Sequence, residues 1–298
     1  MCNSGVGYGY SWIGIWKSPD MTNGSWALVR DARDDTWPIG PAYFRVHTVY
    51  NAATKLYVMW VNTAFGKFDY AVGTSADPEG PFTFVDWVDV GRASGGDFDI
   101  FVDDDGAAYF IYTATGAGHT MAVERLSDDY LSSAAAVTPT APNVTSGVFG
   151  IAFVEAPAMF KRNNIYYALF GNCCCFCGHG SGIQVYTADQ PLGPWTYHDN
   201  VGCLANTTLA PGCGCGMASG ACQNYGDSLT KAQQNFVIPI AQADGSVQYV
   251  WTGDRWQSAA DGTKAHDLQY WSVLEFQNVD GIDLPVQFTW QDEIQINV

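Results

Sequence analysis

The chain of 298 residues carries 30 acidic and 13 basic side chains, a formal net charge of −17. A field of that sign repels nucleic acid and anionic membrane surfaces, so the charge excludes partners of both kinds. The sequence contains no run of about eighteen apolar residues and therefore predicts no membrane span. Its 11 Trp, 16 Tyr, 16 Phe and 32 Gly are typical of short strands joined by tight turns.

Two kinds of element recur along the chain. One is a strand, a turn and a second strand, with a Gly-Pro turn in its two clearer copies; the other is the aromatic-rich returning strand of a hairpin, preceded by turn residues. In chain order, the predicted elements are strand–turn–strand at 15–26, hairpin strand 56–60, strand–turn–strand 70–84, hairpin strands 108–112 and 166–170, strand–turn–strand 183–197 and hairpin strand 248–252.

The spacing of the hairpin strands predicts the fold. Tyr57 and Tyr109 are 52 residues apart, Tyr109 and Tyr167 are 58 apart, and Tyr167 and Tyr249 are 82 apart because a Cys-rich stretch intervenes. Four-stranded repeats at this period are typical of propeller blades. Four hairpins plus an N-terminal fragment predict an all-β, five-bladed β-propeller whose first blade is incomplete. A sandwich fits the composition but not the period.

Residues 1–298 are therefore expected to form a single domain with a Cys-rich insertion at about 171–222. Its cysteines suit either a disulfide-braced loop or a metal site. Disulfides are favoured, because the runs do not form the two separate Cys-x-x-Cys pairs of a zinc ribbon and only His179 lies nearby. The candidates are Cys173, Cys174, Cys175, Cys177, Cys203, Cys213, Cys215 and Cys222. Sequons at Asn23, Asn143 and Asn206 also indicate an oxidising compartment, so we expect a secreted protein whose leader is not part of this chain.

Three charged residues share one position in the repeat. Arg45, Asp97 and Glu155 each lie twelve residues before the tyrosine of their returning strand, inside otherwise apolar segments. A charge in the interior is costly unless it is paired or functional, so three at one register predict a site on the propeller axis. The alternative is an ion network that only holds the channel closed.

The two carboxyl groups of this set suit acid catalysis. An Asp and a Glu that face each other raise the cost of ionising both, so that one keeps its proton near neutral pH and can act as a general acid. Cleavage of a glycosidic bond needs such an acid, together with a group that guides water or attacks from the opposite face.

These residues lie within a longer series of motifs that resembles glycoside hydrolase family 43, the five-bladed propeller glycosidases. The resemblance is strongest to the subgroup that includes exo-β-1,3-galactanases. It runs in order through residues 17–21, 49–51, 57–60, 75–82, 97–106, 126–131, 155–157, 160–162, 233 and 253–256.

The resemblance implies a role for each site residue. Glu155 would be the general acid, and Asp97 would tune its pKa and orient it. Gln233 would position the water, with Gln234 as the neighbouring alternative, because the strand that carries the usual base is expected to be missing. The predicted sugar-binding residues are Arg45, His47, Asp254, Arg255 and Trp256.

The implied activity is that of an exo-acting, inverting hydrolase of a cell-wall glycan, with β-1,3-galactan as the leading substrate. Phe44 stands where galactanase-like relatives carry a Glu. The alternatives are therefore an arabinofuranosidase or xylosidase of the same family, or a catalytically impaired glycan-binding propeller. We expect a monomer that binds an oligo- or polysaccharide and needs no cofactor or metal, since the acidic run 103–106 is explained by a hairpin turn.

Overall fold

The computed structural model describes residues 2–4, 11–31, 43–63, 68–91, 94–137, 144–150, 153–172, 180–203, 229–262 and 266–296. These residues form antiparallel β-sheets, with one short helix, α1 (Ala134–Val137), and a 3-10 turn at Thr115–Ala117. None of the helical turns in these ranges has the length and apolar character needed to cross a membrane.

Five sheets, numbered here in chain order, contain most of the strands. Sheet 1 comprises β1 (Cys2–Ser4), β2 (Ser11–Lys17) and β3 (Ala27–Asp31); sheet 2 comprises β4 (Tyr43–Asn51), β5 (Leu56–Thr63), β6 (Tyr70–Ser75) and β7 (Thr83–Val88). Sheet 3 comprises β8 (Gly95–Val102), β9 (Ala108–Ala114) and β10 (Thr120–Arg125). Sheet 4 comprises β11 (Val154–Arg162), β12 (Ile165–Asn172), β13 (Gln184–Ala188) and β14 (Thr196–Asn200). Sheet 5 comprises β15 (Gln233–Ala241), β16 (Val247–Arg255) and β17 (Leu268–Val273), and β18 (Phe276–Val279) pairs with β19 (Ile282–Pro285) as a separate hairpin.

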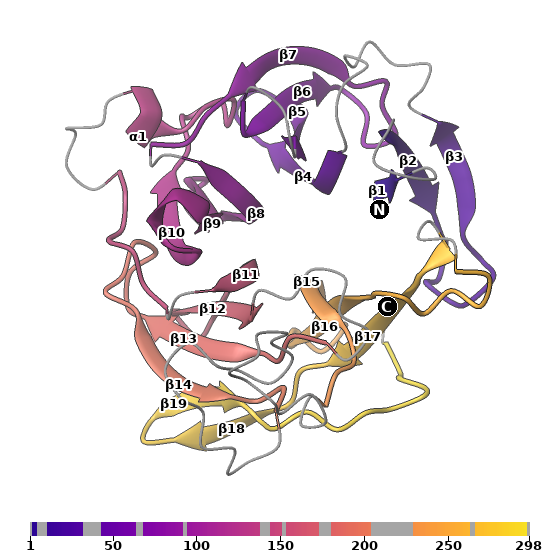
Figure 1. The fold of residues 1–298 in the computed structure, drawn as a ribbon, viewed down its shortest axis with the longest axis vertical. Coiled ribbons are helices and arrows are strands. Elements are labelled where there is room, and N and C mark those ends of the chain that lie inside the picture. The colour runs from indigo at the N-terminus through magenta and orange to yellow at the C-terminus, as the bar shows by residue number, and fades with distance from the viewer. Residues whose placement is uncertain are drawn as a thin grey trace.

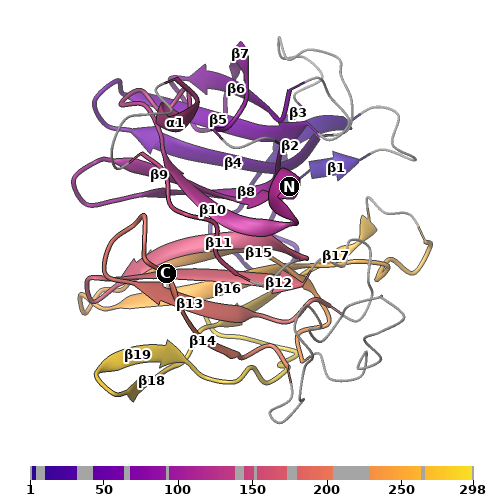
Figure 2. The same ribbon diagram turned by 60° about the vertical axis from the view of Figure 1, so that its left-hand side comes forward.

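The five sheets follow one another around a common centre, with the first strand of each sheet nearest to it (Figure 1). The view turned by 60° shows the β18–β19 hairpin on the outside of the molecule, beyond β14 of sheet 4 (Figure 2). Trp26 lies edge-on to Trp271 at 5.9 Å between ring centroids, so the chain after β2 of sheet 1 and β17 of sheet 5 are in contact.

Apolar side chains pack between neighbouring sheets, because the second strands of sheets 2 to 5 are buried on both faces. On β5, Val58 and Trp60 pack toward sheet 3, whereas Met59 and Val61 pack toward sheet 1. Alternation with a period of two thus divides one continuous apolar run between two cores. Sheets 3 and 4 share a third core and sheets 4 and 5 a fourth.

The structure confirms the predicted hairpins. The aromatic-rich segments at 56–60, 108–112, 166–170 and 248–252 lie in β5, β9, β12 and β16, each paired with the strand before it. The repeated strand–turn–strand units at 70–84 and 183–197 correspond to β6–β7 and β13–β14, and the looser copy at 15–26 spans the turn between β2 and β3.

The expected Cys-rich insertion is in part regular sheet, since β13 and β14 lie within 171–222 and complete sheet 4. Cys203 directly follows this part of the sheet and is disulfide-bonded. The remaining cysteine candidates, at 173–177 and 213–222, lie outside the described residues, so their pairing stays a prediction.

Candidate active site

Each inner strand of sheets 2 to 5 is interrupted by a β-bulge near the centre of the ring. The ladder shifts between Phe44 and His47 on β4, and at the corresponding part of β8, β11 and β15. A bulge inserts a residue, bends the strand and redirects the neighbouring side chains. Arg45 and Ala156 adopt positive φ values of 52° and 61° at their bulges. The four bulges therefore redirect four strand ends at one place, which we call the hub.

The register of the second strands places the charged residues at one height. Glu155 pairs with Gly171, four residues after Tyr167. Arg45 lies in the bulge between the pairs Phe44–Asn62 and His47–Trp60, and Asp97 lies in the bulge between Gly95–Ala114 and Phe98–Tyr112. The equivalent position of sheet 5 is Gly253, opposite Gln234, and the next pair is Gln233 with Asp254. Residues more than a hundred positions apart in sequence are thus brought to the same level of the hub.

Glu155 lies between two polar side chains from different sheets. It is buried, with 8% of its surface exposed. Its Oε2 accepts from Nε2 of Gln233 at 3.5 Å, and its Oε1 lies 3.5 Å from Nδ1 of His119. The hydrogen bond to Glu155 raises the pKa of His119, because the imidazolium form gains a carboxylate partner. The carboxyl group thus has one oxygen directed to sheet 5 and the other to the turn before β10.

Two adjacent glutamines of β15 have different surroundings. Gln233 accepts a hydrogen bond from the indole Nε1 of Trp256 at 2.7 Å. Since an indole can only donate, this contact fixes the amide oxygen toward Trp256 and the NH₂ group toward Glu155. Gln234 instead accepts from Nε1 of Trp251 at 2.8 Å and donates to backbone carbonyls of sheet 4, including that of Leu169. Gln233 therefore faces the site, and Gln234 joins two sheets.

Asp97 is the second carboxyl group of the hub. Its Oδ1 lies 3.4 Å from Nε of Arg45. Burial raises the pKa of Asp97 to about 6; the charge of Arg45 opposes this shift, and the charges of Glu155 and Asp254 add to it. A carboxyl group that titrates near pH 6 beside a second acid is the arrangement that supports proton transfer near neutral pH.

Arg45 connects β4 to β15 across the hub. Its Nη2 donates to the carbonyl of Gln234 at 2.6 Å, and its Nη1 donates to the carbonyl and side-chain oxygens of Asn235 at 3.2 and 3.3 Å. With only 6% of its side chain exposed, the guanidinium group holds Asp97 and the bulge of β15 in place. Its described contacts position Asp97 and β15, and its predicted role in sugar binding stays a prediction.

The other predicted sugar-binding residues lie at different distances from Glu155. Asp254 is opposite Gln233 and accepts from Nε2 of Gln269 at 2.5 Å. Trp256 contacts Gln233 directly, as described above. The guanidinium group of Arg255 lies 5.1 Å from the ring centroid of Trp290, on the layer that packs between sheets 4 and 5. Asp254 and Trp256 therefore adjoin the site, and the described contact of Arg255 is to Trp290.

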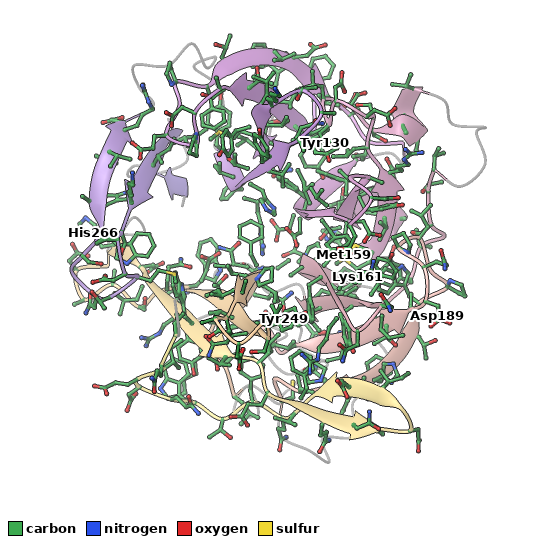
Figure 3. The ribbon with its side chains drawn as sticks, turned by 180° about the vertical axis from the view of Figure 1, so that it is seen from behind. Tyr130, Met159, Lys161, Asp189, Tyr249 and His266 are labelled. Carbon is green, nitrogen blue, oxygen red and sulfur yellow. The ribbon has the colours of Figure 1, made fainter. Side chains whose placement is uncertain are left out.

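His47 belongs to a contact between strands of sheets 2 to 5. Its Nδ1 is 2.6 Å from Oδ1 of Asp99, and its ring packs 4.5 Å from that of Phe236. Oδ2 of Asp99 accepts from the backbone NH of Met159 at 2.8 Å, at the point on β11 that is labelled in Figure 3. His47 therefore contributes to the packing of the strands that form the hub.

Within the described ranges, no group of three or more His, Cys, Asp or Glu side chains has a geometry suited to a metal ion. The acidic run at 103–106 is a turn, where Asp103 accepts from Nζ of Lys161 at 2.7 Å and from the hydroxyl of Tyr166 at 2.6 Å. These contacts tie Asp103 in the turn to two residues of sheet 4.

The profile of the Glycosyl hydrolases family 43 matches residues 4–219 of the chain, a span that includes Asp97 and Glu155. The chain belongs to this family. Family 43 members are glycosidases, and the predicted resemblance is thereby confirmed.

Solved structures of the family share the fold. A family 43 β-1,3-galactosidase solved with galactodeoxynojirimycin matches with a TM-score of 0.71 and 21% identity, over 99% of this chain and 90% of that chain. The exo-β-1,3-galactanase of Phanerochaete chrysosporium, solved with β-1,3-galactotriose, matches with a TM-score of 0.67 and 20% identity, over 92% of this chain and 56% of that chain.

A curated relative, the β-D-galactofuranosidase xynD of Aspergillus niger, is 32% identical over 131 residues. The match covers 42% of this chain and 35% of the Aspergillus protein, so the chain aligns with about a third of that relative.

Sequence reasoning missed His119 and Phe153, which both lie beside Glu155. His119 lies outside the hairpin repeats, in the turn before β10, and no spacing relates it to Glu155. Phe153 lies two residues before Glu155 and is 53% exposed. A large aromatic residue so close to the candidate acid is the one signal that was available in the sequence.

Proposed function

We propose that this chain is an inverting, exo-acting glycosidase that uses Glu155 as general acid, with a β-1,3-linked galactan as substrate. The observation that carries the proposal is the position of Glu155 at the hub, between Gln233 and His119 and close to the charge of Asp97. We further infer that the five sheets are the blades of a five-bladed propeller, with sheet 1 as the incomplete first blade.

The surroundings of Glu155 support single displacement by water. Protonation of the glycosidic oxygen by Glu155 lets the bond to the leaving sugar break, and water adds to the anomeric carbon. The proton that this water loses passes to solvent, from which the Glu155 carboxylate takes up a proton before the next turnover. Gln233 is an amide and cannot form the covalent ester of a retaining mechanism, but it can orient a water molecule. Trp256 fixes the orientation of that amide. Direct attack by water inverts the configuration of the sugar.

The substrate class is supported by the relatives. The solved structures with the same fold are described as β-1,3-galactosidases and exo-β-1,3-galactanases, and one contains β-1,3-galactotriose. One observation favours a second candidate, a furanosidase of the same family. Phe44 is half-buried at the hub end of β4, where galactanase-like sequences carry a Glu, and the curated relative is described as a galactofuranosidase.

We also propose that the protein is secreted and acts as a monomer. The sequon residue Asn23 is exposed in the turn between β2 and β3, where a glycan can be attached without disturbing the sheets. The disulfide bond of Cys203 is consistent with an oxidising compartment.

The test is hydrolysis of β-1,3-galactan, followed by proton NMR of the first product. We expect release of galactose from chain ends, with the α-anomer appearing before mutarotation. Parallel assays use the p-nitrophenyl β-galactopyranoside, β-galactofuranoside, α-arabinofuranoside and β-xyloside. Turnover of a furanoside alone would favour the second candidate, and β-galactose as first product would contradict inversion. Binding of galactan without turnover would indicate a glycan-binding propeller.

A further inference from the structure

Phe153, which is exposed, and His119, which is half-buried, form an aromatic pair beside the candidate acid. Phe153 directly precedes β11 and is 53% exposed, although phenylalanine is a residue that folding normally buries. Its ring lies 6.1 Å from that of His119, with an angle of 19° between the two planes. His119 in turn lies 3.5 Å from Oε1 of Glu155. The pair therefore continues the site outward from the carboxyl group.

The backbone holds this pair in a fixed position. The NH of Phe153 donates to the carbonyl of Gly118 at 3.2 Å, and the NH of Val154 donates to the carbonyl of His119 at 2.9 Å. Phe153 and His119 have φ values of 62° and 54°, in the left-handed region that bulky residues rarely adopt. Strain of this kind persists only where the surrounding structure enforces it, and it is concentrated at functional sites.

The two oxygens of Glu155 are directed to different partners. Oε2 is directed to Gln233, which under the proposed function orients the attacking water. Oε1 is directed to His119, on the side where Phe153 is exposed. In inversion, water and leaving group lie on opposite faces of the anomeric carbon, so under the proposed function we expect the leaving sugar on the His119 side.

We propose that Phe153, supported by His119, is the surface on which the leaving pyranose of the glycan stacks. A pyranose ring presents a face of C–H groups that packs on an aromatic ring, and Phe153 has no polar atom to select among hydroxyl groups. The contact would bind the sugar beyond the cleaved bond and help to align its glycosidic oxygen with Glu155. This inference rests on the proposed function, because it takes Glu155 as the acid.

The test compares two substrates that differ only in the leaving group. In β-1,3-galactobiose the leaving group is a sugar, whereas in β-galactosyl fluoride it is a fluoride ion with nothing to stack. For Phe153→Ala we expect kcat/KM on galactobiose to fall about tenfold, the loss of one aromatic contact, and kcat/KM on the fluoride to stay within about twofold. Phe153→Trp should retain most of the galactobiose activity because it keeps an aromatic face.

Tyr197→Ala, at an exposed aromatic residue of the outer strand β14, is the matched control and should change neither rate. Equal losses of Phe153→Ala on both substrates, or no loss on galactobiose, would overturn the inference while the proposed function stands. A wild-type protein inactive on both substrates would instead overturn the proposed function and, with it, this assignment. Melting temperatures of all variants separate either result from unfolding.

Discussion

Two buried glutamates, Glu124 on β10 and Glu155 on β11, have opposite surroundings. Glu124 is fully buried and accepts three short hydrogen bonds: from the hydroxyls of Tyr112 and Ser133, both at 2.5 Å, and from the NH of Gly91 at 2.9 Å. It thereby joins β9 and β10 to the segments before β8 and around α1. Each of these three contacts is donated to the carboxyl group of Glu124, which holds its side chain in place.

Glu155 retains 8% exposure, and its described side-chain contacts, to Gln233 and His119, are both 3.5 Å long. One partner can itself carry a proton, and the charge of Glu155 helps to raise the pKa of the nearby Asp97. Glu124 is therefore held by short hydrogen bonds from three elements, whereas the described contacts of Glu155 are longer. Two buried carboxyl groups can thus have different surroundings, which makes the two glutamates a test of the proposed role of Glu155.

The largest expected effect is on the activity of Glu155→Gln. The amide keeps the shape of the side chain but has no proton to donate, so kcat on galactan should fall at least about a hundredfold. Because the contacts of Glu155 are long, the melting temperature should change little. Activity within a few-fold of wild type would remove Glu155 from the role of acid.

Glu124→Gln should show the reverse pattern. The new NH₂ group would face donors, leaving at least one buried hydroxyl without its acceptor, and the free energy of unfolding should fall by about 2 kcal/mol. Chemical denaturation measures this loss, and kcat/KM of the remaining folded protein should match wild type. A variant that loses activity but no stability would contradict the comparison.

A smaller effect is expected for Arg45→Met, in the pH profile. As pH falls, Asp97 takes up a proton with a pKa of about 6, which the charge of Arg45 holds down. If activity needs ionised Asp97, kcat/KM should fall as pH drops through about 6. Removal of the cation should raise this pKa and move the acidic limb to higher pH.

The control for this shift is the pH profile of Asp97→Asn, from which the limb should disappear. An unchanged limb in Arg45→Met would show that a different group titrates. Stability follows the opposite course, since the pKa of Asp97 is higher in the folded protein than its ordinary value of 3.8. The contribution of the Asp97 carboxyl group to the free energy of unfolding is therefore full below pH 3.8 and is lost as the pH rises through about 6.

Regular repetition made much of this structure predictable. The equal sequence spacing of Arg45, Asp97 and Glu155 from their returning strands correctly predicted that all three lie beside the bulge of an inner strand, because the three hairpins pair in nearly the same register. Sequence could not separate Gln233 from Gln234, since a bulge next to them decides which side chain faces the hub. His119 was missed because it lies in a turn that is not part of the repeated hairpins.

The contacts of Arg45 also constrain how the molecule acquires its activity. This side chain joins positions 190 residues apart, and the acid-bearing strand lies between them in sequence. A growing or truncated polypeptide that has not yet incorporated β15 lacks both the anchor of the guanidinium group and the amide beside Glu155. The proposed proton transfer should therefore become possible only after sheet 5 has joined the other sheets during folding. Partial unfolding of sheet 5 should likewise abolish activity before the other sheets unfold.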